Sequence, residues 1–104
     1  MARLIWTEPA LADLDTIAEY IVLDDSRAAA RFVKKVFNSV ERLERFPNSG
    51  KRPAELTGTP YREVVVPPCR MFYRVDRELV YILYITRSER LLRAWLLESR
   101  ERAH

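Results

Sequence analysis

The feature that most constrains this 104-residue chain is a set of three short apolar runs in its second half. The runs occupy residues 61–66, 70–75 and 79–86, and each is rich in the β-branched and aromatic residues that strands favour. Only three residues separate each run from the next. Connections of this length join neighbouring antiparallel strands and are too short for a parallel crossover. The sequence therefore predicts an antiparallel meander of three strands.

The first half of the chain has apolar residues at helical spacing, which predicts two helices. The first is expected to begin after Thr7, whose hydroxyl suits an N-cap, and to end near Leu23. The second is expected at about residues 27–45, with Ser26 as its cap. Two amphipathic helices joined by a tight turn need a further apolar layer to cover, and the predicted strands can supply it.

Three further segments complete the predicted architecture. Residues 3–6 read as a first strand, and residues 47–60 form the longest loop, with three prolines and both glycines of the chain. Residues 91–104 fit either a short amphipathic helix or a mobile tail that a partner orders. The predicted fold class is α+β, in the order β-α-α-β-β-β, with a mostly antiparallel sheet packed against a helical hairpin in one domain, 1–104.

Arginines within the predicted strands set the expectations for function. Strand periodicity places Arg70, Phe72 and Arg74 on one face of the sheet and the apolar residues between them, with Val75, on the other. The apolar face should pack on the helices. A guanidinium is costly to bury alone, so Arg70 and Arg74 should face water, a carboxylate or an anionic partner.

Charge is unevenly distributed along the chain. Residues 1–25 carry a net charge of −5 and residues 26–53 a net charge of +6, and arginine supplies 15 of the 18 basic residues. This imbalance suggests an anionic partner, although a genome rich in G and C would also favour arginine codons. The basic face of the second helix can accordingly be read as a solvated surface or as a nucleic-acid footprint.

Composition argues against several classes of protein. The single cysteine, Cys69, cannot form an internal disulfide, which fits a reducing cytoplasm. The only histidine, His104, is the last residue, so a metal site is not expected, and nothing calls for a cofactor. No apolar run is long enough for a transmembrane helix, so no membrane association is expected.

The predicted order of elements occurs together with a specific set of sequence phrases. The phrases lie at residues 6–21, 28–33, 40–47 with Gly50, 61–66 and 73–75. With this order and these phrases, the chain resembles the toxins of the RelE/ParE superfamily of bacterial toxin–antitoxin modules over about residues 3–90. The resemblance implies a growth-arresting toxin that is silenced by a small antitoxin encoded beside it. It also implies that the toxin contacts operator DNA only through that antitoxin.

The resemblance leaves two targets open. RelE-like toxins cut mRNA on the ribosome, and the arginine of their third strand is matched here by Arg70, with Arg87 and Arg90 as looser matches. The lysine pair and the His-Tyr ending of nuclease members have no counterpart, so the acid–base groups are missing. This absence favours the ParE-like alternative, inhibition of DNA gyrase by protein contact. A third possibility is a non-toxic member that only binds antitoxin.

The remaining candidate residues are assigned to surfaces. Arg62, Arg74 and Tyr84 are candidates for contact with nucleic acid or another target, although strand arginines commonly pair with carboxylates and strand tyrosines commonly pack in a sheet. The apolar residues of the C-terminal segment either close the core or bind the antitoxin. They are Leu91, Leu92 and Trp95.

Overall fold

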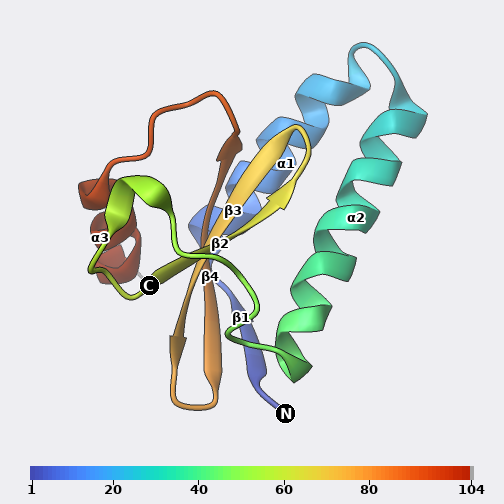
Figure 1. Ribbon diagram of the computed structural model, residues 1–104. Helices are drawn as coiled ribbons and strands as arrows, with labels where there is room; N and C mark the ends of the chain where they lie inside the picture. The colour runs from blue at the N-terminus through green and yellow to red at the C-terminus, as the bar shows by residue number, and fades with distance from the viewer. Residues whose placement is uncertain (104) are drawn as a thin grey trace.

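A helical hairpin packs on one face of a four-stranded sheet, and a third helix lies on the opposite face (Figure 1). The computed structural model describes residues 1–103, and His104 lies outside them. The helices within residues 1–103 are too short or too polar to span a bilayer. The elements are β1 (Arg3–Trp6), α1 (Glu8–Val22), α2 (Ser26–Arg45), a 3-10 turn (Ala54–Leu56), β2 (Tyr61–Val66), β3 (Cys69–Asp76), β4 (Leu79–Arg87) and α3 (Ala94–Ala103).

The sheet has the strand order β1-β4-β3-β2. Strands β2, β3 and β4 form the predicted antiparallel meander, and β1 joins it in parallel beside β4. The α+β prediction is thus confirmed. One predicted boundary was wrong by a residue, because Cys69 was expected in the connection before the run 70–75. It begins β3, opposite Val66 on one side and Arg87 on the other, and its side chain is buried.

Side-chain caps fix where the two hairpin helices begin. Thr7 caps α1 as predicted, and its hydroxyl also donates a hydrogen bond to the Ile82 carbonyl at 2.6 Å, which ties the helix start to β4. The predicted cap of α2 was wrong by one residue. Asp25 is the cap, accepting a hydrogen bond from the Arg27 N–H at 2.9 Å, and Ser26 is the first helical residue. A carboxylate suits this position because it also interacts favourably with the helix dipole.

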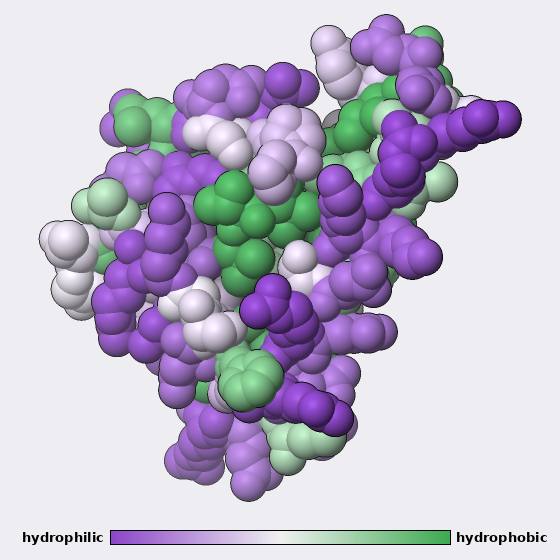
Figure 2. Space-filling model, turned by 45° about the vertical axis from the view of Figure 1, so that its right-hand side comes forward, coloured by the Kyte–Doolittle hydropathy of each residue, from purple (hydrophilic) through white to green (hydrophobic). Residues whose placement is uncertain are grey.

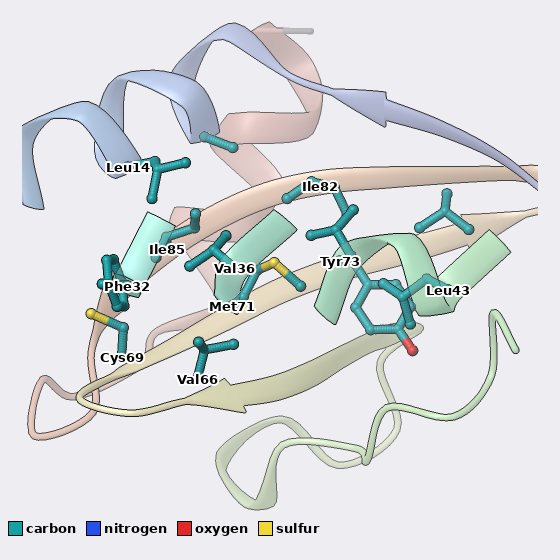
Figure 3. Close-up of a cluster of buried hydrophobic side chains, with 13 residues drawn as sticks. Leu14, Phe32, Val36, Leu43, Val66, Cys69, Met71, Tyr73, Ile82 and Ile85 are labelled. Carbon is teal, nitrogen blue, oxygen red and sulfur yellow. The ribbon is translucent and has the colours of Figure 1, made fainter. Parts of the chain in front are cut away.

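The main core lies between the helical hairpin and the sheet (Figure 3). Leu14, Phe32, Val36 and Leu43 come from the helices and face the apolar side of the strands (Figure 3). Met71, Tyr73 and Ile82 are among the strand residues that they meet, so the predicted packing face of β3 is confirmed.

A second, smaller core lies on the other face of the sheet, beneath α3. The register between β3 and β4 shifts, with Phe72 opposite Tyr84 but Tyr73 opposite Ile82, so β4 contains one extra residue, Leu83. This bulge turns Leu83 and Tyr84 to the same side, where they pack with Phe72. Phe72 shares its face with Arg70 and Arg74 as expected, yet it is fully buried, because α3 covers this side of the sheet.

Tyr73 also fixes the loop that leads into β2. Its hydroxyl donates to the Pro47 carbonyl and accepts from the Gly50 N–H, both at 2.8 Å. A Cβ atom at Gly50 would lie 2.5 Å from that hydroxyl and 2.8 Å from the Glu63 carbonyl oxygen, so only glycine fits this close approach. The same loop then carries Glu55 toward the sheet.

Candidate functional site

Arg70, the arginine that the nuclease pattern singled out, is held between two carboxylates. Its Nε donates to Glu63 at 2.6 Å, and its two terminal nitrogens donate to the two oxygens of Glu55 at 2.8 and 2.9 Å. Its guanidinium also lies 4.9 Å from the centre of the Phe72 ring. The side chain of Arg70 is 12% exposed and that of Glu63 only 3%. Three guanidinium donors are therefore already used inside the protein.

The electrostatics of this cluster stabilise its charged form. The hydrogen bonds that Arg70 donates to Glu55 and, secondly, to Glu63 raise the pKa of the Arg70 guanidinium despite its partial burial. The same hydrogen bond from Arg70 lowers the pKa of the Glu55 carboxyl below its ordinary range. Lys51 adds a more distant contact, with its Nζ 3.6 Å from the second oxygen of Glu63. The two cations and the two carboxylates of this cluster compensate one another. The cluster therefore holds the 47–60 loop to β2 and β3, and little net positive charge remains to bind a phosphate.

The two other strand arginines also make internal contacts. Arg62 donates to the carbonyls of Asn48 and Gly50 at 3.1 and 2.8 Å, not to a carboxylate across the sheet. Arg74 donates to both carboxylate oxygens of Glu101, the shorter contact being 2.8 Å, so it anchors α3. The arginines of β2 and β3 thus do not present a free clamp.

Tyr84 contacts Arg100, which forms a second attachment of α3 to the rest of the fold. Its ring stacks on Phe72 with centroids 6.0 Å apart, and the Arg100 guanidinium lies 4.9 Å from its centre. Arg100 in turn makes two hydrogen bonds to the Asp13 carboxylate, at 2.8 and 3.0 Å, and one to the Leu83 carbonyl at 2.9 Å. These hydrogen bonds connect α3 to α1 across the end of the sheet.

Arg87 and Arg90 lie beside an open groove between α1 and the end of β4. Its lining includes Tyr20 and Tyr84 together with Arg87, Glu89 and Arg90. Arg87 pairs with Glu89, but both side chains are about half exposed, at 47% and 63%. Arg90 makes no side-chain ion pair within residues 1–103. Within residues 1–103, no ion pair or side-chain hydrogen bond joins these two arginines to the Arg70 cluster, and they line a different surface.

The C-terminal segment divides into a buried part and an exposed part. Leu92 is 4% exposed and Leu97 is fully buried, and both pack in the second core. Leu91 and Trp95 are 64% and 60% exposed. Of the three residues considered for antitoxin binding, Leu92 thus lies in the core, and Leu91 and Trp95 are each exposed apolar side chains.

Comparison with known proteins identifies the family to which this geometry belongs. Residues 4–92 match the family described as the ParE toxin of the type II toxin–antitoxin system parDE. The chain belongs to the ParE toxin family. The resemblance inferred from the sequence is therefore confirmed, and the chain is a type II toxin of the ParE/RelE superfamily.

Individual relatives of this ParE-family toxin carry names from both branches of the superfamily. Toxin RelE2 of Caulobacter vibrioides is 36% identical over 91 residues, which cover 88% of this chain and all of the relative. Putative toxin Y4kP of Sinorhizobium fredii is 40% identical over 79 residues, covering 74% of this chain and 79% of the relative. The solved chromosomal ParDE system from P. aeruginosa contains a chain with a TM-score of 0.72 and 32% identity, matched over 86% of this chain and 98% of that one.

Sequence reasoning missed the acidic partners of three arginines, two in β3 and one in α3. Glu55, Glu101 and Asp13 hold Arg70, Arg74 and Arg100, and they are 15, 27 and 87 positions away from them in the chain. Opposite charge was the only signal in the sequence, and it does not select one carboxylate from fifteen. These pairs form because the loop and the C-terminal helix fold back over the sheet.

Proposed function

We propose that this ParE-family toxin arrests growth by binding DNA gyrase and inhibiting it through protein contact. The observation that carries the proposal is the ion pairing of Arg70. RNA cleavage on this surface would need an arginine available to the scissile phosphate and a group to take the proton of the attacking hydroxyl. Arg70 instead binds Glu55 and Glu63, and both carboxylates are used in binding it.

Two further observations support a contact mechanism. The only histidine of the sequence is His104, outside the segment matched to the family. Tyr84, which lines the open groove, stacks on Phe72 and contacts the Arg100 guanidinium. Inhibition by contact requires neither an acid nor a base, only an exposed surface that fits the target.

The test is a supercoiling assay with purified gyrase and the purified toxin. Gyrase inhibition or trapped cleaved DNA at stoichiometric toxin supports the proposal. In parallel, mRNA from cells expressing the toxin is mapped by primer extension. Cuts at codon positions in translated messages, with gyrase unaffected, would instead establish the RelE-like activity. Normal growth on expression of the folded toxin would indicate a member that only binds antitoxin.

We also propose that an antitoxin covers the apolar surface formed by Leu91 and Trp95. Two large apolar side chains that are 64% and 60% exposed, close together in sequence, are typical of a surface that a partner covers. Arg87 and Arg90 line the groove between α1 and the end of β4, and Arg90 directly precedes Leu91 in the sequence. A segment with apolar and acidic side chains would complement both. Contact with operator DNA in a sequence-specific manner is assigned to that antitoxin.

Calorimetry with the protein encoded beside the toxin tests this surface. Trp95→Ala should weaken the complex at least tenfold, because an exposed aromatic side chain is a frequent interface anchor. Val65→Ala is the matched control, since Val65 is also about half exposed but lies on β2. Equal effects of the two changes would rule out the proposed surface. Thermal unfolding of each free variant checks that the fold is unchanged.

A further inference from the structure

The outward face of α2 is a strongly basic surface that nothing in the described chain covers. The helix Ser26–Arg45 contains six basic and two acidic residues, and all six basic residues are exposed. Within residues 1–103, Arg31 alone among them makes an ion pair, at 4.0 Å from Asp25 and largely exposed to water. We call this surface the basic α2 face, and its residues are Arg27, Arg31, Lys34, Lys35, Arg42 and Arg45.

Helix geometry aligns these six side chains along one stripe. At 3.6 residues per turn, their directions fall within an arc of about 100°, and the two acidic residues fall outside it. The core residues of the same helix point to the opposite side. From Arg27 to Arg45 the stripe runs about 27 Å at 1.5 Å per residue. Figure 2 turns the α2 side forward and shows that hydrophilic surface covers most of it.

We propose that the basic α2 face binds the phosphate backbone of duplex DNA. Each strand of B-DNA carries one phosphate per roughly 3.4 Å of axis, so a stripe of 27 Å can follow about eight base pairs. The helix fixes the backbone positions from which the cations extend, so binding has to order only their side chains. The contact would add affinity that does not depend on base sequence, beside the sequence-specific role assigned to the antitoxin.

The composition of the stripe favours DNA over an acidic protein. Protein interfaces depend on buried apolar and aromatic anchors, with charges at the rim. The arc holds only arginine, lysine and Asn38, with no apolar side chain between them. Beside the helix, Arg42 lines one hollow with Ser39, Ser49 and Lys51, and Glu63, the partner of Lys51, lies in the same lining. Polar side chains of this kind suit phosphate and sugar contacts.

The experiment measures binding of the purified toxin to a labelled duplex of random sequence by fluorescence anisotropy between 50 and 200 mM NaCl. Five phosphate contacts would give a slope of log K against log salt of about −4.5. The test variant is Lys34→Gln with Arg42→Gln, because glutamine keeps helix propensity and both side chains are exposed. Its slope should become shallower by about 1.8.

The matched control removes the same charge elsewhere. Arg93→Gln with Arg102→Gln changes two exposed bases in and before α3, which lies across the sheet from α2 (Figure 1). The slope of this variant should stay within about 0.5 of the unsubstituted protein. Equal losses in the two variants would overturn the proposal, as would no detectable binding at 50 mM salt. Stronger binding of single-stranded RNA through the same residues would overturn the assignment to duplex DNA. Gyrase inhibition is measured separately, so the two proposals can fail independently.

Discussion

The Arg70 cluster should behave as a structural element whose loss destabilises the folded toxin. Arg70→Met keeps most of the aliphatic side chain and removes the guanidinium. It leaves the Glu63 carboxylate, 3% exposed, with only Lys51 at 3.6 Å, whereas Glu55 is 30% exposed and can regain water. The change therefore creates one poorly compensated buried charge.

The expected loss in the free energy of unfolding follows from the burial of the Arg70–Glu63 pair. Removing one partner of a buried ion pair costs about 3–5 kcal/mol. The Lys51 contact and the exposure of Glu55 place Arg70→Met at the lower end, at about 3 kcal/mol in the free energy of unfolding. With an unfolding entropy of about 2.1 cal/mol/K per residue, this corresponds to a melting temperature lower by about 14 °C.

Urea unfolding followed by tryptophan fluorescence measures the effect, with Arg74→Met as the matched control. The Arg74–Glu101 pair is more exposed, at 38% and 28%, so its loss should cost about 1 kcal/mol or less. Adding Glu63→Met to Arg70→Met removes the unpaired carboxylate and should restore stability to within about 1 kcal/mol of the unsubstituted toxin. The reasoning is refuted if Arg70→Met costs no more than Arg74→Met, or if the double variant recovers nothing. Loss of toxicity in Arg70→Met would then have to be ascribed to a direct role.

Three further predictions follow from single groups. Tyr73→Phe leaves the buried Gly50 N–H without its acceptor and should lower the free energy of unfolding by about 1–3 kcal/mol; a loss under about 0.5 kcal/mol in urea unfolding would contradict the hydrogen-bond assignment. Burial raises the pKa of the Cys69 thiol to about 11, so the native toxin should resist thiol reagents at pH 8 and react only in urea, and fast native labelling would count against this burial. Because Arg70 lowers the pKa of Glu55 from its ordinary value of 4.5, this pair stabilises the fold fully above pH 4.5 and progressively less as pH falls through the lowered value. The stability difference between the unsubstituted toxin and Arg70→Met should therefore narrow from pH 6 to pH 3 in acid titrations of urea unfolding, and a constant difference would show that the pair does not act in this way.

Local signals explain why most of the fold could be predicted. The caps, the helical spacing and the three apolar runs each depend on residues close together in the chain, and the family phrases lie in the same segments. Two details of the fold that were not predicted, the cap of α2 and the bulge in β4, also concern local structure. Asp25 and Ser26 are both good caps, and no local signal favours the carboxylate over the hydroxyl. The β-bulge at Leu83 has no sequence signal, because an apolar residue fits a strand whichever way it faces.

The sequence by itself determined the four strands, the two hairpin helices, their order and the alternation that places Arg70 and Arg74 opposite the main core. Only the tertiary structure decided what those arginines do. The 47–60 loop brings Glu55 to Arg70, and α3 brings Glu101 to Arg74 and covers Phe72. Periodicity fixes the face on which a side chain lies, because it depends on the backbone of that strand alone. The partner of a charge depends on where distant segments fold, and this cannot be read from any local pattern.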